Sequence, residues 1–143
     1  MDKIDTKIIS LLERNGRISF SDLANAVGLT KTPCWNRVKH LEEMGVITGY
    51  GARIDERKLG MQIRGMIHVV IDFSMSEEFE QAAIKHSSVI RCAAVTGDFD
   101  YILEVLAKDM LEFDSLLRAD LSRLPGVQRF STSISTREVK ARR

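Results

Sequence analysis

The spacing of apolar residues changes its period along this chain. Apolar side chains recur at helical spacing over residues 4–46, whereas strand-like alternation begins near residue 63. This change predicts two domains, residues 1–47 and residues 63–143, because each period requires its own kind of packed layer. The stretch between them, residues 48–62, contains glycines and no long apolar run, which predicts a short wing strand followed by a linker.

The first domain is predicted to consist of three short helices. The spacing of its apolar residues places one buried stripe on each helix, and Cys34, Val38 and Leu41 form the stripe of the third. Caps and stops are expected, in chain order, at Asn15-Gly16 (a left-handed stop), Ser19 or Ser21 (a cap), Gly28 (a stop), Thr30 or Thr32 (a cap) and Met44-Gly45 (a stop). Together with the wing strand, this order predicts a winged helix-turn-helix.

The second domain is predicted to have the element order βαββαβ. The expected elements are strand 63–73, helix 74–86, strand 89–96, strand 101–107, helix 109–124 and strand 127–138, with capping boxes at Ser74 and Asp109. This order predicts an α+β fold with a ferredoxin-like sheet that carries both helices on one face. The strands also hold apolar residues on the other face, so we expect that face to pack against a second copy of the chain.

The outward face of the third helix is cationic in a chain that is almost neutral. The sequence has 21 Lys and Arg against 20 Asp and Glu, so a contact with a polyanion must come from a local patch. Residues 31–41 contain no carboxylate, and we expect this helix to enter the major groove of double-stranded DNA. The residues expected to bind DNA are Arg17, Lys31, Thr32, Pro33, Trp35, Asn36, Arg37, Lys39 and His40.

These residues differ in what they offer to DNA. The amide of Asn36 can pair with adenine, and the methyl group of Thr32 can contact a thymine methyl. Arg37 and Lys39 are expected to contact phosphate only. Trp35 either enters the groove or packs against the wing, and the sequence leaves both open. For the helix as a whole, the alternative interpretation is a solvated basic face that binds nothing.

Several motifs in the same order make the whole chain resemble the leucine-responsive regulator/AsnC family of bacterial and archaeal transcription factors. These motifs are Asp2–Asp5, Asn15–Ser19, Val27–Thr30, Thr32–Cys34, Arg37–Lys39 with Leu41-Glu42, Val95–Tyr101, Asp109-Met110, Leu124–Val127 and Glu138–Lys140. The resemblance implies a DNA-binding N-terminal domain, a C-terminal domain that dimerises through its sheet, and dimers that assemble into octamers or open arrays. It also implies a small effector, often an amino acid, bound between dimers.

Two features depart from the family pattern. Trp35 stands where the family commonly has an aliphatic residue or phenylalanine, so the operator preference is not transferred. The chain ends with the basic segment Lys140–Arg143, which we expect to be a frayed end rather than a DNA contact.

The turn Gly97–Asp100 is the candidate effector site. A zwitterionic amino acid needs an acceptor for its ammonium group, which Asp98 or Asp100 can supply, and donors for its carboxylate, which backbone N–H groups around Gly97 can supply. A plain tight turn is the alternative interpretation. With the family resemblance, the residues expected to bind the effector are Thr96, Gly97, Asp98, Phe99, Asp100, Tyr101, Ser131, Thr132 and Ser133.

Other classes of function have less support in the sequence. The three histidines fall on different predicted elements and neither cysteine has a local partner, so we expect no catalytic site, no metal and no cofactor. No apolar run approaches the length of a membrane span, and the N-terminus lacks the pattern of a signal peptide, so we expect a cytoplasmic, nucleoid-associated protein. Two alternatives stay open, an architectural DNA-wrapping protein without an effector and a regulatory module without DNA.

Overall fold

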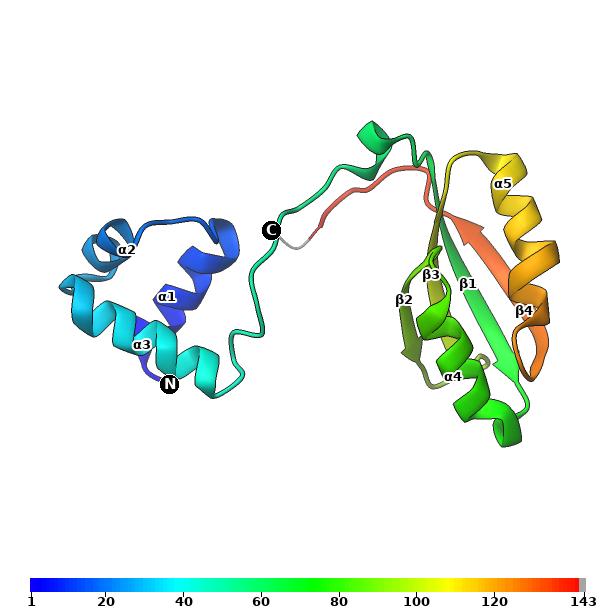
Figure 1. Cartoon of the computed structure of the whole chain (residues 1–143), viewed down its shortest axis with the longest axis horizontal. Coiled ribbons are helices and arrows are strands. Elements are labelled where there is room, and N and C mark those ends of the chain that lie inside the picture. The colour runs from blue at the N-terminus through cyan, green and yellow to red at the C-terminus, as the bar shows by residue number, and fades with distance from the viewer. Residues whose placement is uncertain (142–143) are drawn as a thin grey trace. The chain divides into compact units, whose positions relative to one another are not determined.

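The computed structural model describes residues 1–141, which form two compact units (Figure 1). The first unit spans Met1–Ile54 and the second spans Asp55–Lys140. Arg142 and Arg143, at the end of the basic C-terminal segment, lie outside the described residues. None of the helices in the described part of the chain is long and apolar enough to span a lipid bilayer.

The N-terminal unit is built from three helices around one apolar core. The helices are α1 (Lys3–Arg14), α2 (Phe20–Val27) and α3 (Lys31–Glu43). Ile8 of α1 and Leu23 of α2 pack in this core against Cys34, Val38 and Leu41 of α3. The predicted buried stripe of α3 is therefore confirmed, and the residues between its members face outward.

The helix ends show which capping groups act. Ser19 caps α2, because its hydroxyl accepts a hydrogen bond from the Asp22 N–H, and Gly28 ends the helix at a φ of 77°. Thr30 is the N-cap of α3 but makes no side-chain capping bond. The predicted left-handed stop at Asn15 is wrong: its backbone is extended, with a φ of −144°. The Asn15 side chain instead accepts a hydrogen bond from the Arg17 N–H, which supports an extended turn.

The predicted wing strand does not form. The described structure contains no strand within residues 48–62, where a 3-10 turn over Glu56–Leu59 is instead capped by Asp55 and closed by Gly60 at a φ of 86°. A strand needs a hydrogen-bonded neighbour, and the described residues around this segment supply none. Two glycines and the absence of a long apolar run are therefore insufficient to predict a wing strand.

The C-terminal unit is a four-stranded antiparallel sheet with two helices. Its elements are β1 (Ile63–Ile71), α4 (Ser76–Lys85), β2 (Val89–Ala94), β3 (Tyr101–Ala107), α5 (Met110–Ser115) and β4 (Val127–Ile134), and the strand order is β2-β3-β1-β4. This arrangement confirms the predicted βαββαβ order and ferredoxin-like topology (Figure 1).

Both helices cover the same face of this sheet. Phe79 of α4 and Phe113 of α5 belong to one core cluster with Ile67 and Val69 of β1 and Leu103 of β3. The opposite face carries the alternate residues of β1 and β3, which are partly exposed in the single chain. This second face will be called the open face.

Several predicted details of this unit are wrong. Ser74 does not cap α4, because a 3-10 turn over Phe73–Met75, capped by Asp72, precedes the helix and leaves the Phe73 side chain 72% exposed. The predicted helix 109–124 is divided into α5, a π-helical turn over Leu116–Asp120 and a 3-10 turn over Leu121–Arg123. The last strand ends at Ile134 instead of residue 138.

The predicted cap at Asp109 is present in part. The Asp109 carboxylate accepts a hydrogen bond from the Glu112 N–H. The Glu112 carboxylate, however, accepts from the Lys108 N–H rather than from Asp109, so the box closes one residue early.

Gly65 in β1 provides a test of this core. A Cβ atom at position 65 would overlap the buried Phe113 ring, 2.8 Å from its Cζ. We therefore expect Gly65→Ala to lower the free energy of unfolding by about 1 to 3 kcal/mol, which is typical of overpacking. Urea unfolding followed by circular dichroism measures it. Gly51→Ala, with no atom within 4 Å and no left-handed φ, is the control and should change little. Equal stability of the two variants would contradict the packing.

Candidate nucleic-acid interface and ligand site

Helix α3 presents an exposed polar face. Lys31, Thr32, Pro33, Asn36 and His40 are all exposed. Cys34, Val38 and Leu41 form the buried side of α3. The exposed face lies on the other side of the helix and is directed away from the core of the N-terminal unit. Arg17 is also exposed, in the turn that precedes α2. The face combines amide, hydroxyl and cationic donors, which are the groups that contact base edges and phosphates.

Lys39 does not project freely from this face. Its Nζ lies 3.1 Å from a Glu42 carboxylate oxygen and 5.7 Å from the centroid of the Trp35 ring. The Tyr50 hydroxyl donates a 2.8 Å hydrogen bond to the same carboxylate. This bond and the ion pair with Lys39 lower the pKa of Glu42, while burial and Glu42 raise the pKa of Tyr50 to about 12. Glu42 is therefore an anion and Tyr50 a neutral donor at neutral pH.

Trp35 takes an intermediate position between the two alternatives that the sequence left open. Its side chain is 44% exposed, so part of the ring faces solvent. The rest lines a cavity of about 260 Å³ together with Tyr50, which follows α3 in the segment expected to be the wing. Trp35 thus packs toward that segment without being covered by it.

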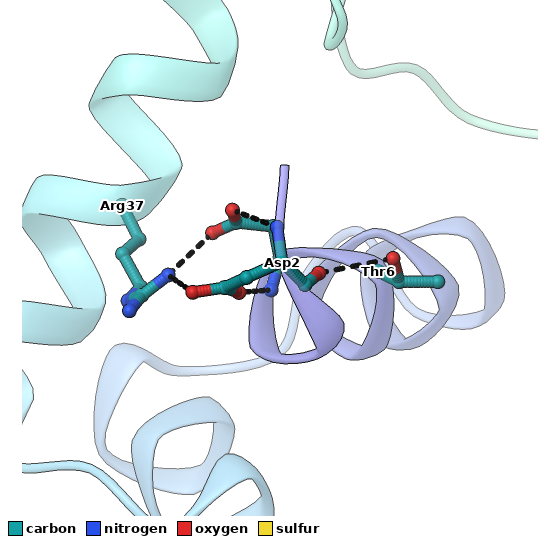
Figure 2. A network of polar contacts seen from close by, with 4 residues as sticks. Asp2, Thr6 and Arg37 are labelled. Atoms are coloured by element: carbon teal, nitrogen blue, oxygen red, sulfur yellow. Dashed lines mark hydrogen bonds and ion pairs between the residues drawn. The ribbon is translucent and has the colours of Figure 1, made fainter.

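Arg37 is held by two carboxylates from the start of α1 (Figure 2). Its Nη1 lies 2.8 Å from Asp2 Oδ2 and 2.8 Å from Asp5 Oδ1. The backbone hydrogen bond from Asp5 and the ion pair with Arg37 lower the pKa of Asp2. Although residues 31–41 lack acids, their cations therefore meet acids elsewhere in the unit. Lys31 is the one cation of α3 without a carboxylate partner in the described structure.

In the C-terminal unit, the turn between β2 and β3 contains two acidic residues, Asp98 and Asp100, which lie in different environments. The Asp100 carboxylate accepts a 2.9 Å hydrogen bond from the Ile71 N–H, and its own N–H donates to the Val69 carbonyl. Asp100 therefore fastens the turn to β1. Asp98 is exposed and lines an open hollow of about 550 Å³ with Thr96, Phe99 and residues of the sheet.

The hollow lies on the open face and is lined by the aromatic side chains His68 and Phe99, and Phe99 also contacts a basic side chain of β4. His68 of β1 and Phe99 of the turn have ring centroids 5.3 Å apart, and the Arg129 guanidinium of β4 lies 5.2 Å from the Phe99 centroid. Ile102 of β3 also lines it. Sequence reasoning missed His68, Ile102 and Arg129 because their proximity depends on strand order and register.

The strand register also places the remaining predicted ligand residues on opposite faces of the sheet. Ser131 pairs with His68 and Ser133 pairs with Met66, so both lie on the open face. Thr132 pairs with the buried Ile67 and lies on the helix-covered face. Tyr101 is also on that face, 6% exposed, where its hydroxyl donates a 2.6 Å hydrogen bond to Glu80. Tyr101 and Thr132 therefore cannot line the hollow beside Asp98, and this corrects the expectation for them.

The chemistry of these two sites is that of binding. Within residues 1–141, no group of three or more His, Cys, Asp or Glu is arranged to hold a metal ion. The hydroxyl of Tyr101, which hydrogen bonding to Glu80 and burial hold at a pKa of about 12, is a neutral donor in the core. What the surface offers instead is a helix face with polar donors and a hollow beside a carboxylate.

A helix-turn-helix unit joined to an α/β unit with an open hollow defines a ligand-responsive, DNA-binding transcriptional regulator. Comparison with known families agrees, because residues 1–48 match a winged helix-turn-helix DNA-binding domain and residues 65–143 match the Lrp/AsnC ligand binding domain. The chain belongs to the Lrp/AsnC family. The family resemblance inferred from the sequence is thereby confirmed, and its members are transcriptional regulators rather than enzymes.

Individual relatives align along almost the whole chain. A leucine-responsive regulatory protein from Haemophilus influenzae is 42% identical, with 98% of this chain and 86% of the relative covered. A transcriptional regulator from Neisseria meningitidis, solved in complex with L-methionine, is 31% identical with a TM-score of 0.96, covering 99% and 94% of the two chains. A feast or famine regulatory protein from M. tuberculosis, complexed with L-methionine, is 26% identical with a TM-score of 0.92, covering 99% and 96%.

Proposed function

We propose that this regulator reads double-stranded DNA with the exposed face of α3 and responds to an amino acid bound at the turn between β2 and β3. The main support for these DNA-binding residues is that Lys31, Thr32 and Asn36 are exposed in the first turns of α3. The N-terminal residues of a recognition helix are the ones that contact base edges. Such a regulator acts at the nucleoid, in the cytoplasm.

Within this face, Asn36 is the proposed base reader and Lys31 the proposed phosphate contact. The Asn36 amide can form two hydrogen bonds with adenine, while Thr32 can contact a neighbouring thymine methyl. Lys31 is not neutralised by a carboxylate, in contrast to Lys39, so Lys31 releases more counterions on meeting a phosphate. Arg17, His40 and Lys39 add weaker contacts around this centre, and Trp35 with Pro33 shapes the surface.

We expect Asn36→Ala to relax the base preference at one position by about 1 to 3 kcal/mol. The probe is a duplex selected from a random pool by the wild-type protein, compared with its single-base variants and with a scrambled duplex. Lys31→Ala is the matched variant, and it should weaken binding to all duplexes similarly and lower the salt slope by about 1. Equal losses on selected and scrambled DNA for both variants would contradict the assignment of Asn36.

The proposed ligand site uses the chemistry of a free amino acid. Asp98 can accept the ammonium group, and the N–H groups around Gly97, whose φ is 104°, can bind the carboxylate as a nest does. Phe99, His68 and Ile102 supply a wall for the side chain. The two similar structures that hold L-methionine support an amino acid as the ligand class.

The open face supports a homodimer. Met66 and Val70 of β1 and Ile102 and Leu106 of β3 alternate on this face and are only partly buried in the single chain. Apolar rows of this kind in a small domain are stabilised when a second copy covers them. The further assembly of dimers into octamers is proposed from the family resemblance.

A purely architectural DNA-wrapping protein is the other candidate that the sequence raised. It needs charge along the DNA-facing surface and no ligand site. In this unit two of the three cations of α3 are paired with acids, which reduces the charge available for wrapping. The regulatory proposal is therefore favoured.

A further inference from the structure

The two acids at the start of α1 use all four of their carboxylate oxygens in one polar network (Figure 2). The Asp2 N–H donates to Asp5 Oδ2 and the Asp5 N–H donates to Asp2 Oδ1, which makes the capping box of α1. The other oxygen of each acid, Asp2 Oδ2 and Asp5 Oδ1, accepts a hydrogen bond from Arg37 Nη1. The capping box therefore fixes both acids in the orientation in which they accept hydrogen bonds from Arg37.

The position of Arg37 on α3 allows its contact with Asp2 and Asp5 to restrict the rotation of this helix about its axis. Arg37 lies between the exposed Asn36 and the buried Val38, at the edge of the buried stripe. Apolar packing along that stripe is not directional and permits small rotations of the helix about its axis. Two charge-assisted hydrogen bonds to fixed carboxylates restrict those rotations, because their strength depends on geometry.

The local charge argues against a phosphate contact by Arg37. Two carboxylates face one guanidinium, so the cluster as a whole is negative. The Arg37 side chain is only 33% exposed, while that of Asp2 is 53% exposed. A phosphate that approached Arg37 would meet the Asp2 carboxylate as well, and like charges repel. This cluster is therefore unsuited to hold DNA directly.

We propose that Arg37 is a positioning residue, which Asp2 and Asp5 hold so that α3 presents Asn36 to the base edges in one fixed orientation. Arg37 acts on DNA recognition through the orientation of α3 and does not contact a phosphate. This inference rests on the proposed role of α3 in reading DNA. It assigns a function in specificity to three residues, two of which lie outside the recognition helix.

The test compares full-length Arg37→Gln and the double variant Asp2→Asn, Asp5→Asn with the wild-type protein. Asparagine is also a good N-cap, so the double variant removes charge while keeping side-chain size and capping ability. Binding is measured on the selected and scrambled duplexes across a salt series, at a temperature where circular dichroism shows each variant to be folded. We expect both variants to lose about tenfold in the ratio of selected to scrambled affinity, since a good base contact discriminates by that order. The salt slope on scrambled DNA should not change.

Two further variants separate positioning from a general loss of stability. In an Asn36→Ala background, Arg37→Gln should cause no further loss of selectivity, because the group being aimed is already absent. Arg37→Lys retains a donor for both carboxylates and should restore most of the selectivity. Failure of the Asn36→Ala background to remove the effect would overturn the proposal, as would a lower melting temperature with an unchanged affinity ratio.

The sign of one result distinguishes the proposal from a direct phosphate contact. If Arg37 bound phosphate, removing the acids would free it, and Asp2→Asn, Asp5→Asn would bind all DNA more tightly, while Arg37→Gln would lower the salt slope by about 0.9. Either observation overturns the positioning role. If Asn36→Ala and Lys31→Ala also fail to affect DNA binding, the proposed use of α3 fails instead, so the two failures are distinguishable.

Discussion

Replacement of Phe79 by alanine should lower the free energy of unfolding of the C-terminal unit by about 3 to 5 kcal/mol. The Phe79 side chain is completely buried between α4 and the sheet, with its ring centroid 4.7 Å from that of Tyr101. Removal of the Phe79 ring takes apolar contacts from α4 and from the sheet, and it leaves a cavity in the core. Because whole domains are stable by only about 5 to 15 kcal/mol, this loss would leave the unit marginally folded.

The single tryptophan of the sequence permits the two units to be followed separately. Trp35 lies in α3, so its fluorescence reports the N-terminal unit, whereas circular dichroism of Phe79→Ala in urea reports both units. We expect an earlier transition by circular dichroism and a smaller change by fluorescence. Gln81→Ala, at an exposed position of the same helix, should stay within about 0.5 kcal/mol of the wild type. A loss of less than about 1 kcal/mol for Phe79→Ala would contradict the complete burial of this side chain.

Asp98→Asn should weaken amino-acid binding about tenfold to 150-fold, which corresponds to the loss of one hydrogen bond to a charged group, about 1.5 to 3 kcal/mol. The substitution keeps the size of the side chain and removes the charge that would pair with the ligand ammonium. Binding is measured by isothermal titration calorimetry with L-methionine, and with any other L-amino acid that raises the melting temperature of the wild-type protein.

Two controls locate this effect at the ammonium group. An N-acetylated form of the same amino acid has no ammonium, so wild type and Asp98→Asn should bind it equally weakly. Glu77→Gln, which removes an exposed carboxylate from α4, should leave amino-acid affinity unchanged. Equal affinity of Asp98→Asn and wild type for the free amino acid would exclude the proposed role. If no amino acid affects the wild-type melting temperature, the architectural alternative gains support instead.

Local patterns were sufficient to predict most of the fold. The change of apolar period located both units, and Cys34, Val38 and Leu41 form the buried stripe of α3 that their spacing predicted. Where the prediction failed, the cause was an interaction that local spacing does not contain. Residues 48–62 have no neighbouring strand, and α5 departs from regular helix at Leu116 while Leu116 and Leu121 remain in the core.

The candidate sites were harder to predict because their geometry comes from distant contacts. A cation in a segment without acids, residues 31–41, suggests a phosphate contact, yet Arg37 pairs with residues 32 and 35 positions away in the sequence. Tyr101 follows the proposed ligand turn directly, yet strand alternation directs it into the core. The Asp2-to-Asp5 spacing, typical of a capping box, was the one local signal for the acids that hold Arg37.

The hydrogen bonds made by Asp100 affect how much of the turn between β2 and β3 is ordered before a ligand binds. Its carboxylate and its N–H fix the turn to two residues of β1, one of the two interior strands of the sheet. Folding of the sheet therefore supplies part of the free energy that orders this loop, and an arriving ligand loses less of its affinity to that ordering. A turn that is already ordered can bind its ligand faster and more tightly than a turn that must first fold around it.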